Sequence, residues 1–137
     1  MKQFSFWLQD LILKILTFNF FVRKRVIKRY TKGISFRKVL DAGCGTGRLA
    51  PMFPKEKYYG IDIDRDLILY ARNKYKGYKF VVGDLIRFTS NEKFDLVIVV
   101  GVLHHLNDND TKQFLKLLSR QLSKGGKIII IEAIYPL

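Results

Sequence analysis

The residues with the clearest chemistry in this sequence lie between Val39 and Leu49, where the chain reads VLDAGCGTGRL. Two apolar residues run into Asp41, and three glycines then alternate with small residues. The glycines are Gly43, Gly45 and Gly47. This order predicts a buried strand that turns sharply through a glycine loop and enters a helix. Such glycines allow positive φ and close approach of a ligand, and the helix start offers free N–H groups, so the stretch predicts a nucleotide-binding loop.

The spacing of the glycines distinguishes between two nucleotide cofactors. A dinucleotide fingerprint requires G-x-G-x-x-G, but Arg48 occupies the third glycine position of that pattern. Asp41 at the strand end would also repel a pyrophosphate, whereas it suits a cationic ligand. The form D-x-G-x-G-x-G resembles the first motif of the class I S-adenosylmethionine (SAM)-dependent methyltransferases. The resemblance implies that Asp41 and the glycine loop hold the methionine end of SAM, and a glycine-rich turn of another α/β protein is the alternative.

A second apolar run, over residues 58–62, ends in Asp62. In nucleotide-binding α/β folds, an acid at the end of the second strand accepts hydrogen bonds from ribose hydroxyls. Asp62 holds that position, and a solvated strand-end carboxylate is the alternative interpretation. Asp64 is expected to be the N-cap of a helix over residues 65–76, because its side chain can accept from free backbone N–H groups.

A third run, over residues 78–82, is followed by the tripeptide Gly83-Asp84-Leu85. The same family carries a G-D-hydrophobic turn at this point. The resemblance therefore implies that Asp84 accepts from the adenine amino group and that the backbone of Leu85 meets the ring. A loop aspartate that initiates a turn is the alternative. The resemblance also assigns to the cofactor Cys44, Ile63 and Gly101.

The fourth apolar run, over residues 94–106, contains the adjacent pair His104 and His105. A nearly continuous apolar run predicts a strand buried on both faces, as in a parallel sheet. The run resembles the family's F-D-hydrophobic signature and its hydrophobic-L-H-H-hydrophobic extension, and it lacks the proline-aromatic tetrapeptide of many enzymes that methylate DNA base amines. The histidines are the candidate catalytic residues, with packing or loop orientation as the alternative. No Cys/His/Asp cluster with ligand spacing accompanies them, so no metal site is predicted.

The rest of the chain completes an α/β pattern. Asp110 is the expected N-cap of a helix that runs to residue 123, and Gly125-Gly126 is expected to end it before a strand over residues 127–132. Alternating strands and helices predict a parallel sheet with helices on both faces. The resemblance, which covers residues 37–134, implies a Rossmann-like, doubly wound sheet of order 3-2-1-4-5. The family's usual strands 6 and 7 have no counterpart in the sequence, so we expect the chain to be a fragment. A partner that covers the edge strand and a minimal form of the domain are the alternatives.

Charge separates an N-terminal segment, residues 1–35, from a SAM-binding α/β domain over residues 36–137. The chain carries 25 Lys and Arg against 12 Asp and Glu, a net charge of +13, and most of the excess precedes the glycine loop. The segment is amphipathic but too short and too charged to span a membrane. A helix packed on the domain is favoured, followed by peripheral contact of residues 4–29 with an anionic membrane, with nucleic acid last. The single cysteine indicates a reducing, cytoplasmic compartment.

These motifs together predict SAM-dependent methyl transfer to a small-molecule or lipid-precursor acceptor. The sulfonium is already a good leaving group, so the protein must supply alignment and a dry pocket rather than a catalytic triad. A SAM-binding regulatory or partner module without turnover is the main alternative. An aminopropyltransferase needs additional acids for its polyamine, and a nicotinamide oxidoreductase is disfavoured by Asp41 and Arg48.

Overall fold

The computed structural model describes residues 19–132 of the 137-residue chain. The chain divides into two compact units, residues 1–34 and residues 35–137. In the first unit residues 19–31 are helical, and the Thr31 hydroxyl donates to the carbonyl oxygen of Ile27 at 2.8 Å. Residues 1–18, which include much of the predicted amphipathic segment, lie outside the described residues. Among those that are described, no helix is long and apolar enough to cross a membrane.

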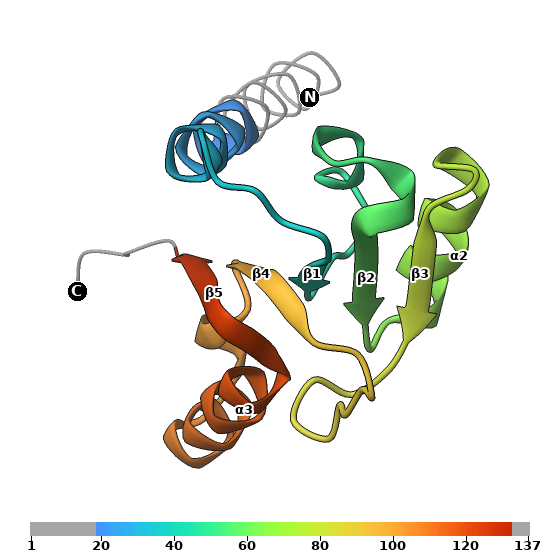
Figure 1. Ribbon diagram of the computed structural model, residues 1–137. Helices are drawn as coiled ribbons and strands as arrows, with labels where there is room; N and C mark the ends of the chain where they lie inside the picture. Colours follow the sequence, from blue (N-terminus) through green and yellow to red (C-terminus); the bar gives the residue numbers. More distant parts are fainter. Residues whose placement is uncertain (1–18, 133–137) are drawn as a thin grey trace, which may run out of the picture. The chain divides into compact units, whose positions relative to one another are not determined.

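The second unit is built on a five-stranded parallel sheet of order β3-β2-β1-β4-β5 (Figure 1). The strands are β1 (Val39–Ala42), β2 (Tyr58–Asp62), β3 (Lys79–Val82), β4 (Phe94–Val100) and β5 (Leu122–Ile131). This confirms the Rossmann-like order 3-2-1-4-5. The direction in which the chain crosses the sheet reverses between β1 and β4, and in open α/β sheets ligands bind outside the carboxyl ends of the strands at this point.

Strands β1 and β4 are buried on both faces, which explains why their sequences are apolar apart from Asp41 and Asp95. Every residue of β1 is buried, and so are residues 96–99 of β4. The helices α2 (Arg65–Lys74) and α3 (Asp108–Gln121) follow β2 and β4. Because the chain moves across the sheet in opposite directions through these two helices, right-handed crossovers place them on opposite faces. The core on the α3 side includes Phe114 and Leu118, which pack with residues of β1 and β4.

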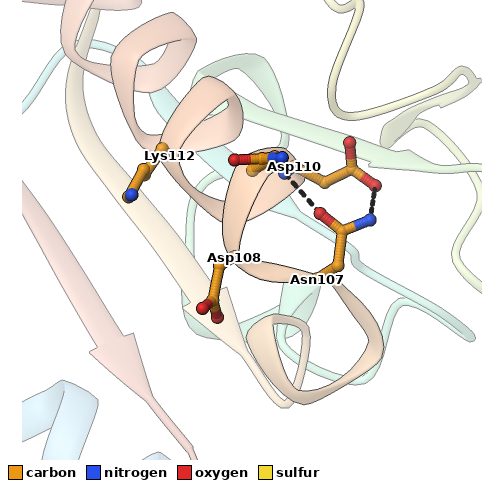
Figure 2. Close-up of a pocket in the computed structure, with 5 residues that line it drawn as sticks. Asn107, Asp108, Asp110 and Lys112 are labelled. Atoms are coloured by element: carbon orange, nitrogen blue, oxygen red, sulfur yellow. Dashed lines mark hydrogen bonds between the residues drawn. The ribbon is translucent and has the colours of Figure 1, made fainter.

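Both helices begin at a side-chain cap. Asp64 caps α2 as predicted, because its Oδ1 accepts from the backbone N–H groups of Asp66 and Leu67 at 2.9 and 3.2 Å. The prediction that Asp110 caps the next helix is wrong. Asn107 is the cap of α3, with its Oδ1 accepting from the Asp110 N–H at 2.9 Å and its amide donating to the Asp110 carboxylate at 2.8 Å (Figure 2). The helix therefore starts one turn earlier, and two aspartates lie in its first turn, where the helix dipole favours them.

The glycine pair after α3 does not end that helix, contrary to the prediction. The helix ends at Gln121, and β5 begins directly at Leu122. Leu122 pairs with Phe94, whereas Lys127 pairs with Leu96, so the residues between them form an irregularity in the strand. Gly125 has a φ of +78° within it. The glycines therefore accommodate a bulge rather than a helix terminus.

The helix expected directly after the glycine loop is also absent from the described structure. Residues 48–57 instead form two short 3-10 turns, η1 (Ala50–Met52) and η2 (Lys55–Lys57). Pro51 lies in the first turn of η1, and Phe53 before Pro54 is extended, with a φ of −127° and a ψ of 151°. Proline lacks an N–H donor and disfavours a helical conformation of the residue before it. The glycine loop is therefore not followed by the N-terminus of a long helix.

The carboxylate of Asp95, at the start of β4, forms hydrogen bonds with two other segments at the amino end of the sheet. Its Oδ2 accepts from the backbone N–H groups of Arg37 and Lys38 at 2.7 and 3.2 Å, and its Oδ1 accepts from the Ser123 hydroxyl at 2.6 Å. The Ser123 hydroxyl, followed by the Arg37 amide, lowers the pKa of Asp95 to about 2 against a burial effect that raises it. The entry to β1, the start of β4 and the start of β5 thus share one carboxylate.

We expect Asp95→Ala to destabilise the domain by about 2 kcal/mol at pH 7, the contribution that a pKa near 2 rather than 3.8 makes to folding. Because the folded pKa is depressed, this contribution is present above pH 4 and is lost as the pH falls from about 4 to 2. Urea unfolding at pH 7 and at stepwise lower pH measures both effects. Glu56→Ala removes an exposed carboxylate and is the matched control. Equal stability of the two variants at pH 7 would contradict the role of Asp95.

Candidate functional site

A pocket of about 620 Å³ lies at the carboxyl ends of the first four strands. Gly43 and Gly45 enter it from the loop after β1, Asp62 from the end of β2, Asp84 from the segment after β3, and Gly101 from the segment after β4. The other lining residues are Ile63, Asp64, Leu67, Leu85, Ile86, Val102, His105 and Leu106. The volume is in the range that small-molecule sites occupy. The pocket thus lies at the position where the strand order predicts a ligand.

The glycine loop is anchored to β2 and packs closely against the segment after β4. The backbone N–H groups of Gly43 and Cys44 both donate to the carbonyl oxygen of Ile61, at 2.8 and 3.0 Å. Gly43 has a φ of +83°, and a Cβ added there would lie 2.4 Å from Cγ2 of Val102. Both its conformation and its surroundings therefore require glycine. The loop backbone forms the floor of the pocket between β1 and β4.

Asp62 connects the glycine loop to the start of α2. Its Oδ2 accepts from the Gly45 N–H at 2.8 Å, and its Oδ1 accepts from the Asp64 N–H at 2.9 Å. A carboxylate has about four acceptor sites, so each oxygen retains capacity for a ligand donor. Asp62 is therefore held in one orientation while it faces the pocket, as a hydroxyl-binding carboxylate must be.

Asp84 presents a second carboxylate on the same wall. Its Oδ1 accepts from the backbone N–H of Ile86 at 3.0 Å, which is the turn that the alternative interpretation predicted. Its Oδ2 lies 3.7 Å from Nε of Arg87, whose side chain is 82% exposed, so this ion pair is weak. Leu85 packs against the hydrophobic core, and Ile63 is 67% exposed at the pocket. A polar acceptor and apolar side chains thus lie together, as recognition of a flat heterocycle requires.

Asp41 does not line the pocket. It is 1% exposed, and the Tyr58 hydroxyl donates to its Oδ2 at 2.6 Å. Gly60 makes room for this contact, because a Cβ there would lie 3.1 Å from the Tyr58 ring and 2.9 Å from Sγ of Cys44. Burial raises the pKa of Asp41 to about 7, opposed by the Tyr58 hydrogen bond and reinforced by the charge of Asp62. Asp41 thus contacts Tyr58 and is not among the residues that line the pocket, and its contact with the cofactor stays a prediction.

Two other predicted cofactor residues support the loop rather than line the pocket. Cys44 is 9% exposed, and burial, followed by the charges of Asp41 and Asp62, raises the pKa of its thiol far above the ordinary value. A thiol of this kind is inert as a nucleophile. A Cβ on Gly47 would lie 2.7 Å from the Phe80 ring, so this glycine allows the loop to pack on β3.

The two histidines have different surroundings. Both lie in η3 (Leu103–His105), with ring centroids 3.9 Å apart. His105 lines the pocket, whereas Nδ1 of His104 lies 2.9 Å from Oε2 of Glu132. Within residues 19–132, no group of three or more His, Cys, Asp and Glu side chains is arranged to hold a metal ion. Of the pair, only His105 is therefore in a position to meet a pocket ligand directly.

Sequence reasoning missed several residues of this site. The pocket also uses Val102 and Leu106, which were predicted only as parts of the apolar run over residues 94–106. Leu67 was predicted only as part of a helix, and no role was predicted for Ile86. Glu132 was also missed, although it ends the fifth apolar run as Asp41 and Asp62 end the first and second. An acid at the end of each of these runs is the signal that could have identified it.

The charge of the lining contrasts with that of the chain. The chain has 25 Lys and Arg, yet the described residues around the pocket include three aspartates and neither lysine nor arginine. The aspartates are Asp62, Asp64 and Asp84. Such a lining disfavours a pyrophosphate and favours a cationic ligand with hydroxyl and amine donors. The site is thus suited to a positively charged nucleoside.

Comparison with known proteins gives a consistent result. Residues 39–126 match a family model described as a methyltransferase domain. An uncharacterized methyltransferase of Bacillus cytotoxicus is 31% identical over 104 residues, covering 74% of this chain and 49% of the relative. The chain therefore spans about half the length of the curated relatives it matches.

Solved structures extend the comparison to the fold. A TehB-like SAM-dependent methyltransferase from Corynebacterium glutamicum is 32% identical with a TM-score of 0.66, covering 78% of this chain and 59% of that one. A glycopeptide N-methyltransferase solved in complex with SAM has a TM-score of 0.70 at 18% identity, covering 79% of this chain and 52% of that one. At this low identity the second likeness concerns the fold alone.

Proposed function

This chain belongs to the class I SAM-dependent methyltransferases, and from that premise we propose that its pocket binds SAM for methyl transfer to a small-molecule or lipid-precursor acceptor. The observation that carries the proposal is the lining of the pocket, which has three aspartates and no described lysine or arginine in a chain of net charge +13. SAM combines a sulfonium cation with ribose hydroxyls and an adenine amine. All of these groups favour carboxylate or other acceptor neighbours.

The residues at the pocket fit this cofactor. Asp62 is assigned to the ribose hydroxyls, because its carboxylate is fixed by the Gly45 and Asp64 amides and retains acceptor capacity. Asp84 is assigned to the adenine amine, with Ile63 and Leu85 against the ring. The backbone of the glycine loop is assigned to the methionine end. Asp41 lies near the end of β1, two residues before Gly43, and its carboxylate is bound to the Tyr58 hydroxyl.

The chain's part in the reaction is alignment and exclusion of water. When bound, SAM supplies an activated methyl group on a good leaving group. The glycine loop and the segment after β4 hold the two reactants at a fixed position, and apolar side chains such as Val102 and Leu106 keep the pocket dry. His105 is the candidate base for an acceptor that must lose a proton, since its ring is at the pocket.

The acceptor class rests on the fourth motif, which resembles that of small-molecule and lipid-precursor methyltransferases. A cytoplasmic location, with peripheral membrane contact through residues 4–29, is part of the same proposal, and most of that segment lies outside the described residues. A module that binds SAM without turnover is the alternative function.

Thermal unfolding of the 137-residue chain tests the cofactor assignment. We expect the melting temperature to rise with SAM and with its product S-adenosylhomocysteine (SAH), and to be unchanged by NAD. A ligand at a hundredfold its Kd stabilises the folded state by about 2.7 kcal/mol, which is readily measured. A cooperative transition that neither SAM nor SAH shifts would reject the assignment. Methyl transfer to a panel of acceptors, assayed on the same preparation, then separates the enzyme from the binding module.

A further inference from the structure

Glu132, the residue directly after β5, accepts hydrogen bonds from three consecutive residues of the segment after β4. Its Oε1 accepts from the backbone N–H groups of Val102 and Leu103, both at 2.8 Å. Its Oε2 lies 2.9 Å from Nδ1 of His104. The Glu132 side chain is 21% exposed, so these contacts are largely shielded from solvent. One carboxylate therefore accepts hydrogen bonds from two backbone N–H groups at the start of η3 and from the ring of His104.

The segment that Glu132 holds forms one wall of the pocket. Val102 lines the pocket, and its Cγ2 occupies the space beside Gly43 that a larger residue would need. Leu103 packs against the hydrophobic core, and His105 faces the pocket at the end of η3. The Gly101 N–H also donates to the Ile131 carbonyl oxygen at 2.9 Å, which extends the pairing of β4 with β5 up to the wall. The position of His105 thus depends on contacts made from β5.

We propose that Glu132 is a positioning residue, which holds the wall formed by residues 101–105 and thereby places His105 and Val102 against the ligand. This inference rests on the proposed function, because it concerns the wall of the same SAM pocket. Glu132 itself does not line the pocket, so its effect is transmitted through the backbone amides of Val102 and Leu103.

The same contact determines the tautomer of His104. Burial raises the pKa of Glu132, but hydrogen bonds from His104 and from the two backbone amides outweigh this effect and bring its pKa below the ordinary value. An ionised carboxylate only accepts hydrogen bonds. Neutral His104 must therefore carry its proton on Nδ1, and this prediction can be measured without any ligand.

Two substitutions in the full chain separate the roles of the carboxylate. Glu132→Ala leaves the Val102 and Leu103 amides without their acceptor, and we expect it to weaken SAH binding by about tenfold. In Glu132→Gln the side-chain oxygen still accepts from both amides, so SAH affinity stays within about threefold of the wild type. The amide of the glutamine then donates to His104, which moves the His104 proton to Nε2. Glu92→Ala, which removes an exposed glutamate paired with Lys38, is the matched control.

Calorimetry with SAH and the ring ¹⁵N chemical shifts of His104 are the measurements. Loss of affinity in Glu132→Ala only, together with a tautomer switch in Glu132→Gln, supports the proposal. Wild-type affinity in Glu132→Ala, or an Nε2-protonated His104 in the wild type, overturns it. If Glu132→Ala does not fold, the His104 ring ¹⁵N spectra of the wild type and of Glu132→Gln still test whether Glu132 accepts from Nδ1 of His104. If the wild type itself does not bind SAH, the proposed function fails, and the tautomer alone then tests the Glu132 contact.

Discussion

Replacing Asp62 with alanine is expected to weaken SAH binding by about a hundredfold, a change of about 2.7 kcal/mol. Two losses combine in this variant. The carboxylate assigned to the ribose hydroxyls disappears, and the Gly45 N–H loses the acceptor that holds the glycine loop, at 2.8 Å in the wild type. A hydrogen bond to a charged group contributes about 1.5–3 kcal/mol, so the expected loss corresponds to one or two such contacts. Calorimetric titration with SAH measures the change.

Asp66→Ala is the control for this experiment. Asp66 is an exposed residue of the first turn of α2 and does not line the pocket, so the substitution removes the same charge close to the same segment. We expect its SAH affinity to remain within about twofold of the wild type, because an exposed charge acts weakly through solvent. If the Asp62 and Asp66 variants bind SAH equally well, Asp62 is not the ribose ligand. A melting temperature close to that of the wild type shows that the domain remains folded.

The strand order 3-2-1-4-5 was implied by the resemblance to the methyltransferase family, whereas burial was predictable from the sequence itself. Strand β4 is covered on both faces, and its sequence is apolar apart from Asp95, which is the pattern that predicted a strand of a parallel sheet. The errors occur where one residue type has two structural uses. Gly125 was assigned to a helix terminus and instead lies in a bulge of β5, and Pro51 and Pro54 prevent a helix that the apolar spacing alone permits.

The site was predictable in part for a related reason. Asp62 ends its apolar run and Asp84 lies two residues after its own, so both are at the carboxyl edge of the sheet, where the pocket lies. The sequence did not show whether the Asp41 side chain lies at the pocket or in the interior, because β1 is buried on both faces. The position of this side chain depends on Tyr58, whose hydroxyl donates to the Asp41 carboxylate from the neighbouring strand. The contacts of Glu132 with the segment after β4 likewise join residues about thirty positions apart.

The burial of Asp41 leads to the largest expected effect on stability. Its pKa is about 7 in the folded protein, against an ordinary value of 3.8. At a pH between these two pKa values, Asp41 has released its proton in the unfolded chain and retains it in the folded chain. Raising the pH therefore favours unfolding. The domain is therefore expected to lose about 4 kcal/mol through this group as the pH rises from about 4 to above 7. This dependence is opposite in sign to that of Asp95.

Urea unfolding between pH 5 and pH 8 measures this effect when the wild type is compared with Asp41→Asn. Asparagine keeps an acceptor for the Tyr58 hydroxyl but does not ionise, so the difference between the two stabilities isolates the titration of Asp41. We expect the wild type to lose stability relative to the variant with increasing pH. In Tyr58→Phe, removal of the hydrogen bond that lowers the Asp41 pKa is expected to move this loss to higher pH. A difference that is constant from pH 5 to pH 8 would show that Asp41 is ionised throughout this range and would contradict the raised pKa.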